Sequence, residues 1–412
     1  MRRVRVACLS AVLGLGLALT SACGSSSSNS SSTPSGGGSS APAATGSTIN
    51  IGVIASMSGS QASSTEQAGY VAQAWEKYIN AKGGINGHPV KIFVEDDQGD
   101  PTAAAAAAKK LVTQDHVISV SGATDNLITA WDSYVTGQGV PIVGGTGNSN
   151  DWFKNPLMFL TPTDVLSGLT LQVKVAKQYG HATKFADLYC AEVASCKDAN
   201  PPLQAAAKAA GVGFTSLPVS STAPDYTAEC LSLKEQGVDY AQLNFTTAAA
   251  VKFVQSCQAQ GYNPTWGTSM QSYAKGYLSL SNFTAYGPAY AFNPAMDTAF
   301  ATAFNGAMDK YAGGKNVTGG PATWTWDALQ LTAKVLANAP ANPTSQDVIN
   351  GLYALQGETL GGELANALTF TKDKAATPGA HPCGFVMGVQ GGKLVAPAGA
   401  DTICASASSS TG

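Results

Sequence analysis

The sequence is poor in charged residues, in histidine and in net charge of either sign. Charged residues make up 12% of the 412 residues, about half of the roughly 25% that is usual. A charge-rich disordered chain is therefore excluded. The formal net charge of -3 lacks the basic excess of a nucleic-acid-binding protein. Four histidines leave little for a histidine-built metal centre, so we expect no metal, no cofactor and no nucleic-acid partner.

Motifs that carry enzyme chemistry are also missing. The sequence has no GxSxG elbow, no GxxxxGK[ST] loop, no HExxH and no GxGxxG after its first apolar run. It has no CxxC pair either, which argues against zinc-ribbon and thioredoxin-like sites. We therefore expect a protein that is not an enzyme, and a secreted hydrolase is the weakest of the functions considered.

The N-terminus has the pattern of an export signal. Three arginines precede an apolar run that ends near residue 22, as in a secretory signal peptide. That run is marginal for spanning a bilayer, and no later segment approaches twenty apolar residues. Leu19–Cys23 resembles the bacterial lipobox, with Thr20 in place of the usual aliphatic residue. We predict cleavage after residue 22 and lipidation of Cys23; the alternative is a freely secreted protein.

The next segment predicts a tether. Residues 24–47 are almost wholly Ser, Gly, Pro, Ala and Thr, a composition that behaves as a flexible linker. We expect residues 23–47 to form a lipid-anchored linker and residues 406–412 a disordered tail. The 412 residues exceed one average domain by a factor of two to three. We therefore expect at least two lobes between the linker and the tail.

Six cysteines remain beyond the signal and Cys23, an even number that indicates disulfides in an exported protein. Fifteen pairings are possible, and pairing of sequence neighbours is the simplest. We predict that one bond closes a loop, one joins adjacent helices and one closes a C-terminal hairpin. The pairs in that order are Cys190–Cys196, Cys230–Cys257 and Cys383–Cys404.

From Ile49 the chain alternates apolar strands with helical stripes. Strands are predicted over 49–55, 90–94, 117–121 and 141–143, and helices over 66–82, 100–114 and 125–135. The alternation restarts with a helix over 164–179 and continues to residue 267. Helices near 294–311, 321–338 and 345–355 and a strand-rich tail from residue 368 follow. This order predicts an α/β fold of two doubly wound, Rossmann-like lobes with parallel sheets.

Three spaced motifs resemble the branched-chain amino-acid-binding protein family, the type I periplasmic solute-binding proteins of ABC transporters. They are IGVI followed by SMSG (51–59), INAKGGING (79–87) and EDDQGDP (95–101). The resemblance implies two lobes joined by three crossovers, with a small ligand between them. Matching element order places the crossovers near 161–163, 290–292 and 370–371. Lobe one would then comprise 48–162 and 292–370, and lobe two 163–291 and 371–405.

The resemblance also implies ligand contacts from the loops that follow the strands. Backbone N–H groups of residues 122–126 would open a helix there and hold a carboxylate or another polar group. Glycine-rich turns, helix caps and lobe packing are the competing explanations for these loops. The candidate ligand-binding residues are Ser58, Thr124, Asp125, Asn126, Thr146, Asn148, Tyr189, Glu192, Phe245, Thr246, Met270 and Gln271.

Two departures from relatives that bind α-amino acids favour a neutral, amide-like or aromatic ligand. Residues 268–272 (TSMQS) contain no acid for an ammonium group, and Asp125 as a helix cap would repel a carboxylate. We expect a monomeric lipoprotein that belongs to an ABC importer. Amino acids remain among the solutes that this importer could transport. It would capture a small molecule by hinge closure and deliver it to permease and ATPase subunits. An extracellular ligand sensor on the same fold is the alternative.

Overall fold

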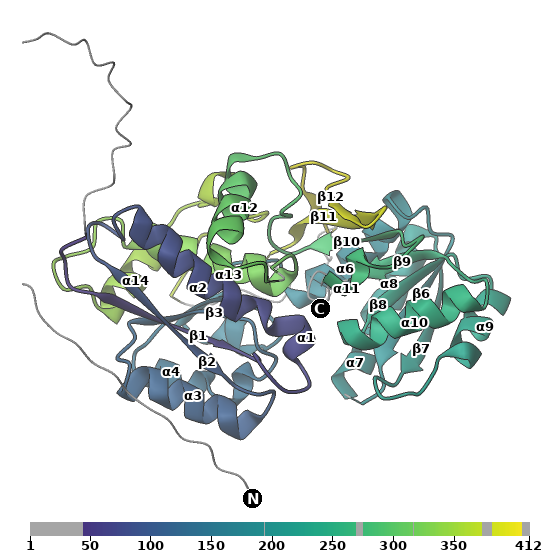
Figure 1. Ribbon diagram of the computed structural model, residues 1–412, viewed down its shortest axis with the longest axis horizontal. Helices are drawn as coiled ribbons and strands as arrows, with labels where there is room; N and C mark the ends of the chain where they lie inside the picture. The colour runs from purple at the N-terminus through teal and green to yellow at the C-terminus, as the bar shows by residue number, and fades with distance from the viewer. Residues whose placement is uncertain (1–43, 193, 269–274, 316, 373–380, 406–412) are drawn as a thin grey trace, which may run out of the picture. The chain divides into compact units, whose positions relative to one another are not determined.

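A computed structural model describes residues 44–192, 194–268, 275–315, 317–372 and 381–405 of the chain. Cys23, Met270, Gln271, the predicted signal and C-terminal tail, and the predicted linker up to residue 43 lie outside these residues. The last linker residues, 44–47, are described, and the amides of Thr45 and Gly46 donate to Gly87 O at 3.0 and 2.9 Å. Figure 1 shows two α/β lobes, each built around its own sheet. The predicted fold class is confirmed, whereas the residue boundaries of the lobes stay a prediction.

The first lobe surrounds a parallel sheet with strand order β2-β1-β3-β4-β5. Its strands are β1 (Ile49–Ala55), β2 (Val90–Asp96), β3 (Ser119–Ala123), β4 (Ile142–Gly145) and β5 (Met158–Phe159). Its helical segments are α1 (Ala62–Thr65), α2 (Gln67–Ala81), α3 (Pro101–Thr113), η1 (Ile128–Ala130), α4 (Asp132–Gly137), α5 (Asp151–Lys154), α12 (Ala299–Tyr311), α13 (Gly320–Val335), α14 (Ser345–Tyr353) and η3 (Leu360–Gly362).

The second lobe surrounds a larger sheet with strand order β12-β11-β10-β9-β8-β6-β7, in which β13 also pairs with β11. Its strands are β6 (Lys184–Cys190), β7 (Gly213–Val219), β8 (Tyr240–Asn244), β9 (Thr265–Thr268), β10 (Ala285–Ala289), β11 (Cys383–Gln390), β12 (Lys393–Val395) and β13 (Ile403–Cys404). Its helices are α6 (Val165–Gln178), α7 (Ala194–Asp198), α8 (Asn200–Ala210), α9 (Thr227–Glu235), α10 (Thr247–Ala259) and α11 (Lys275–Leu278). Strands β6 to β10 pair in parallel, and β11 runs antiparallel to β10.

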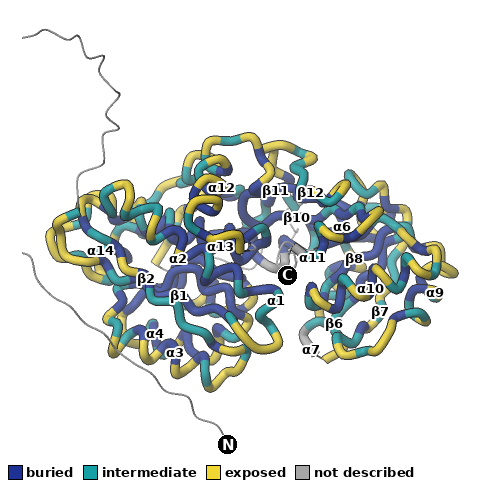
Figure 2. Tube along the Cα trace, in the orientation of Figure 1, coloured by how far each residue is buried: buried dark blue, intermediate teal, exposed yellow. Residues whose placement is uncertain are grey.

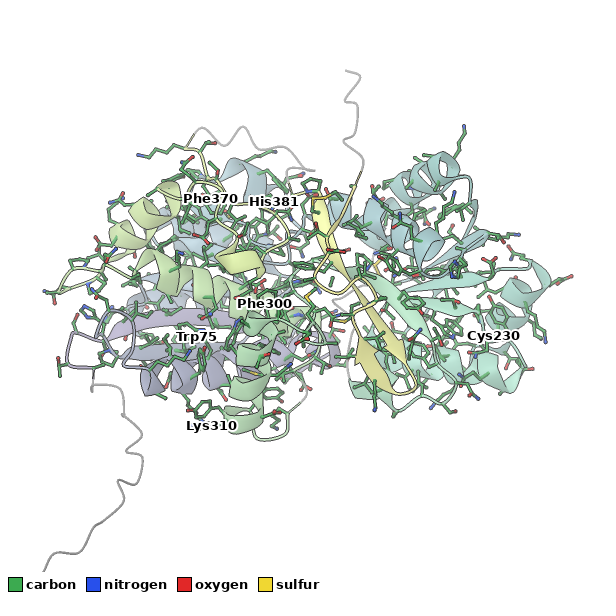
Figure 3. The ribbon with its side chains drawn as sticks, turned by 90° about the horizontal axis from the view of Figure 1, so that it is seen from above. Trp75, Cys230, Phe300, Lys310, Phe370 and His381 are labelled. Carbon is green, nitrogen blue, oxygen red and sulfur yellow. A yellow bond between two sulfur atoms is a disulfide. The ribbon has the colours of Figure 1, made fainter. Side chains whose placement is uncertain are left out.

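Helices cover both faces of each sheet. Because both faces of the strands are buried, their sequences are almost continuously apolar. In the first lobe α2 and α13 pack together on one face, and α3 lies on the other (Figure 1). Trp75 on α2 donates from Nε1 to Gln330 on α13 at 2.9 Å, and its position is labelled in Figure 3. The burial map of Figure 2 accordingly shows buried strands beneath partly exposed helices.

Local signals in the sequence set several element ends. The Asp100 carboxylate accepts from the amides of Thr102 and Ala103, and Pro101 follows it, so α3 begins where predicted. Two glycines with φ of 95° and 74°, Gly83 and Gly84, end α2. The short strands β5 and β10 were not predicted, and the strands of the tail begin at residue 383 rather than at 368.

The predicted disulfides are all confirmed, and each lies in the second lobe. Cys190–Cys196 joins the end of β6 to α7, and Cys230–Cys257 joins α9 to α10. Cys383–Cys404 links directly opposed residues of β11 and β13. Cys230 is labelled in Figure 3 on the helical side of the second lobe.

Candidate ligand-binding site

The direction of the strand order reverses once in each sheet. In the first sheet the reversal lies between β1 and β3, and in the second between β6 and β8. Open parallel sheets bind ligands at such switch points. The residues that directly follow β1, β3, β6 and β8 are therefore the candidates for a ligand-binding site.

One polar residue follows each of four neighbouring strands in the first sheet. Continuing each strand register to the residue after the strand aligns Asp97, Ser56, Thr124 and Thr146, in order across β2, β1, β3 and β4; between β1 and β3 the last paired residues are Gly52 and Val120, four residues earlier. Backbone hydrogen bonds continue the ladder to this level, from Asp97 N to Ala55 O at 3.3 Å and from Thr146 N to Ala123 O at 3.2 Å. We call these four residues the polar row.

The polar row is buried, yet most of its side-chain oxygens have no partner. The exposed fraction is 0% for Asp97, Ser56 and Thr124 and 3% for Thr146. The hydroxyls of Ser56, Thr124 and Thr146 make no hydrogen bond within the described protein. Leaving a buried hydroxyl unsatisfied costs about 1–3 kcal/mol. Three such groups in one region are unusual in a folded protein, in which most buried polar atoms have a partner.

Helix α13 supports the polar row from beneath, at van der Waals distance from β3 and β4. Gly122 (φ 82°) and Gly144 (φ 65°) make this approach possible. A Cβ added to Gly122 would lie 3.0 Å from Thr325, and one added to Gly144 would lie 2.6 Å from the Cβ of Ala328. These glycines therefore fix the helix against the strand ends that carry Thr124 and Thr146.

The predicted helix over 125–135 is wrong, and with it the role of Asp125 as a helix cap. The chain instead leaves β3 as a loop, forms the short η1 and begins α4 only at Asp132. Asp125 is fully buried, and its Oδ2 accepts from Trp131 Nε1 at 2.8 Å. Burial, with a smaller contribution from the nearby Asp97, raises the pKa of Asp125 to about 8. With a pKa of about 8, Asp125 is mostly protonated at pH 7 and would repel a carboxylate only weakly.

The other predicted residues of the first lobe lie at the exposed rim. Ser58 is exposed and donates its hydroxyl to Asp96 at 2.6 Å. Because this bond and backbone amides hold the carboxylate, they outweigh its desolvation and lower the pKa of Asp96. Asn126 and Asn148 are exposed and face each other, with Nδ2 of Asn148 3.4 Å from Oδ1 of Asn126. The loops after β3 and β4 are therefore bridged.

The predicted residues of the second lobe serve varied local roles. Tyr189 is half-buried next to the end of β6. Glu192 accepts from the Ser220 hydroxyl at 2.7 Å, which lowers the pKa of its carboxyl group. Phe245 is buried in the core with its ring 5.7 Å from that of Phe253. Thr246 precedes α10 without a side-chain capping bond.

A buried polar cluster in the second lobe was not predicted. Asp187 on β6 accepts from Asn244 Nδ2 at 2.6 Å, and Asn244 also donates to Gln172 on α6 at 3.2 Å. Desolvation raises the pKa of Asp187 to about 7. The cluster lies beneath the carboxyl ends of β6 and β8, which sequence patterning could not reveal because Asp187 stands inside an apolar strand.

Four tryptophans on or near the elements of the site are core residues. Trp131, Trp152, Trp324 and Trp326 are each at most 1% exposed. Trp324 stacks on Tyr290 with a centroid distance of 6.0 Å. A pocket of about 290 Å³ lies elsewhere, between α11, α12 and the loop before α13.

The described residues contain no cluster of His, Cys, Asp and Glu that could hold a metal ion. Over the same ranges, no helix is both long and apolar enough to cross a membrane.

Three segments meet at Thr163, whose amide donates to Tyr290 O at 3.0 Å and whose hydroxyl donates to Cys383 O. The first two predicted crossovers therefore lie side by side.

A family model described as periplasmic binding protein matches residues 48–393. The chain belongs to the periplasmic binding protein family. The motif-based resemblance is therefore confirmed, and the relatives are named as binding proteins rather than as enzymes.

Relatives of this periplasmic binding protein are distant. The fatty acid ABC transporter substrate-binding protein of Thermomonospora curvata is 17% identical, with a TM-score of 0.68 over 89% of this chain and 94% of its own. LivJ of Streptococcus pneumoniae, a branched-chain amino acid transporter substrate-binding protein solved with isoleucine, is 19% identical, with a TM-score of 0.67 over 84% and 97%. An amino acid binding protein of Pseudomonas aeruginosa is 37% identical over 100 residues, 24% of this chain and only 27% of that protein.

Proposed function

We propose that this protein is the extracytoplasmic solute-binding component of an ABC importer and that it captures a small carboxylate-bearing solute. The observation that carries the proposal is the polar row, with three buried hydroxyls that lack partners inside the protein. Hydroxyls that donate to an ionised carboxylate form stronger hydrogen bonds than they do with neutral groups. The names of the relatives support the same class, because amino acids, isoleucine and fatty acids all carry a carboxylate.

The charge distribution indicates which end of the polar row holds the carboxylate. Adjacent strands are about 4.8 Å apart, so Thr146, three strands away, is about 14 Å from Asp97 across the sheet, whereas the Asp97 side chain interacts with Asp125, the neighbour of Thr124. The anionic end of a ligand is therefore best placed between Thr124 and Thr146. Asp125, which lies beside Thr124, adds little negative charge at pH 7 because its pKa is about 8.

Binding would work through differential affinity for two lobe arrangements. The second lobe offers Tyr189 and Thr246 at the ends of the strands that flank its switch point. A ligand held by the polar row and by these residues stabilises a closed arrangement more than an open one. No covalent step is required. The lobes would comprise residues 48–162 with 292–370 and residues 163–291 with 371–405.

Export and anchoring complete the proposal. Cleavage after residue 22 and lipidation of Cys23 would tether a monomer to the outer face of the cell membrane through residues 23–47. Permease and ATPase subunits would then receive the captured solute. Mass spectrometry of the native N-terminus tests the anchor: a diacylglyceryl group on Cys23 supports it, and an unmodified cleaved terminus refutes it.

Matched ligands test the ligand class. The protein is unfolded, freed of carried-over ligand, refolded and followed by thermal unfolding with leucine, 4-methylpentanoate and 4-methylpentanamide. These share a carbon skeleton but differ in the ammonium and carboxylate groups. Phenylalanine, 3-phenylpropanoate and 3-phenylpropanamide repeat the comparison for an aromatic body. Ligand at about 100 times its Kd adds roughly 2.7 kcal/mol of stability.

The proposal expects stabilisation by carboxylates and none by the matching amides. Stabilisation by 4-methylpentanoate but not by leucine would show that the site does not accept an ammonium group, as residues 268–272 led us to expect. Stabilisation by the amides alone would refute the carboxylate assignment and restore the neutral ligand predicted from the sequence.

A further inference from the structure

Cys383, at the start of β11, lies where separate segments of the chain meet. Its carbonyl oxygen accepts from the Thr163 hydroxyl and from Asn366 Nδ2 at 2.7 Å, and its amide donates to Asn366 Oδ1 at 2.9 Å. The Thr163 amide in turn donates to Tyr290 O at 3.0 Å. Thr163 is fully buried and Asn366 is 7% exposed, so water competes little for these bonds. One residue from each of the first two predicted crossovers is therefore linked to Cys383.

The residues before Cys383 bond the segment that enters α6. His381 Nδ1 lies 2.8 Å from Pro162 O, and the His381 amide donates to Asp164 Oδ2 at 3.2 Å. The Asp164 carboxylate also caps α6, because it accepts from the Ser167 amide at 3.0 Å and from the Ser167 hydroxyl at 2.9 Å. The two segments therefore lie side by side where the chain enters the second lobe.

The disulfide Cys383–Cys404 holds Cys383 against the C-terminal strand. The two cysteines are directly opposed in β11 and β13. Strand β13 contains only two residues, too few to keep its place by strand pairing alone. Lys174 on α6 donates to Cys404 O at 2.9 Å, and the Ala405 amide donates to Pro382 O at 2.7 Å. The disulfide is thus the covalent member of a unit that joins α6, β11 and β13.

A second disulfide provides a contrast. Cys230–Cys257 joins α9 to α10 within the second lobe, and both residues are 0% exposed in its apolar core. This bond stabilises one lobe, whereas Cys383–Cys404 lies at segments that connect the two lobes. Hinge closure is absorbed by backbone rotation in such connecting segments. A constraint at Cys383 therefore acts on the arrangement of the lobes.

We propose that the disulfide Cys383–Cys404 braces the hinge: it keeps Cys383 bonded to Thr163 and Asn366 and so limits how far the two lobes move relative to each other. Cys383 and Thr163 are then positioning residues that act through the hinge rather than on a ligand. Without the disulfide, the ligand-free protein samples more lobe arrangements, and the binding-competent one becomes a smaller fraction. Apparent affinity falls with that fraction. This last consequence rests on the proposed function, whereas the brace does not.

Two double variants of the full chain test the brace without any ligand. The brace variant carries Cys383→Ala and Cys404→Ala. The matched control carries Cys230→Ala and Cys257→Ala, so that it also lacks one disulfide of the second lobe.

Two measurements report on the hinge. Spin labels on unnatural amino acids replace Lys109 on α3 and Lys208 on α8, which are both exposed. Pulsed electron paramagnetic resonance then gives the distribution of distances between the lobes. Amide hydrogen exchange of Thr163 reports on its bond to Tyr290. Its rate is divided by that of the Leu188 amide in β6, which corrects for a general loss of stability.

We expect the brace variant to broaden the distance distribution. Its ratio of Thr163 to Leu188 exchange should rise at least about tenfold, because a disulfide restricts a local opening by more than this factor. The control variant should keep the wild-type width and the wild-type ratio. A wild-type width in the brace variant would overturn the proposal, and so would equal broadening in the control variant.

Thr163→Val decides the question if the brace variant does not fold. It removes the hydroxyl that donates to Cys383 O but keeps the shape of the side chain and all three disulfides. Broadening of the distance distribution then supports the brace, and a wild-type width refutes it. Because no readout uses a ligand, a ligand panel that fails leaves the brace standing. A wild-type width likewise leaves the proposed solute-binding function standing.

Discussion

Replacing Thr124 or Thr146 by valine should change stability and binding in opposite directions. Valine has nearly the shape of threonine but lacks the hydroxyl, and both hydroxyls are buried without a protein partner. Removing an unsatisfied buried hydroxyl relieves part of its cost of about 1–3 kcal/mol. We therefore expect each variant to raise the free energy of unfolding of the ligand-free protein by about 1 kcal/mol.

The same substitutions should weaken binding of a carboxylate ligand. A hydrogen bond to a charged group contributes about 1.5–3 kcal/mol, which corresponds to roughly a ten- to hundredfold rise in Kd. The assay is urea denaturation of the ligand-free protein combined with titration calorimetry of the best carboxylate from the panel. A rise in Kd at both positions would place the carboxylate between Thr124 and Thr146.

Thr332 provides the matched control. It is equally buried, but its hydroxyl lies 2.9 Å from Ser121 Oγ and donates to Ala328 O at 2.8 Å. Thr332→Val should lower the free energy of unfolding by about 1–2 kcal/mol and leave Kd unchanged. If Thr124→Val and Thr146→Val destabilise the ligand-free protein as Thr332→Val does, their hydroxyls are structural and the reasoning from unpaired donors fails.

Two further predictions concern packing and pH. Gly144→Ala should lower the free energy of unfolding by about 1–3 kcal/mol more than Gly139→Ala. Both glycines have positive φ, but the Cβ at residue 144 would meet α13 whereas the one at 139 would meet nothing within 4 Å; equal losses in urea denaturation would contradict this. Burial and mutual interaction raise the pKa of Asp327, and burial raises that of Glu363 to about 7. The folded state therefore keeps protons that the unfolded state loses above about pH 4. The free energy of unfolding should fall as pH rises towards 7, and Asp327→Asn should flatten that slope by up to about 1.4 kcal/mol per pH unit; an unchanged slope would show that Asp327 holds no extra proton.

Most of the fold could be predicted because its signals are local. The Asp100 cap, the Gly83–Gly84 stop and the strand-helix alternation each depend on a few neighbouring residues. The disulfide pairs also followed from short sequence separations. Strand β5 was missed because two residues give no pattern, and β10 was missed because its Gly287 and Pro288 argue against a strand.

The candidate site was harder to predict because it depends on strand register and on tertiary contacts. The sequence led us to Ser58, yet Ser58 is held by Asp96, whereas Ser56, two residues earlier, stands next to Thr124 with its hydroxyl free. Strand pairing across more than sixty residues decides that alignment. The helix predicted over 125–135 failed because the Trp131 indole bonds Asp125 and holds the segment in another conformation.

The close contact between α13 and the glycines of β3 and β4 has a consequence for recognition. Gly122 and Gly144 leave no space between the helix and the strand ends. The backbone that carries Thr124 and Thr146 is therefore held in place by the fold itself, before any ligand binds. Ordering a binding surface in advance removes an entropic cost from association. If the proposed site is correct, its first-lobe half is formed before the ligand binds.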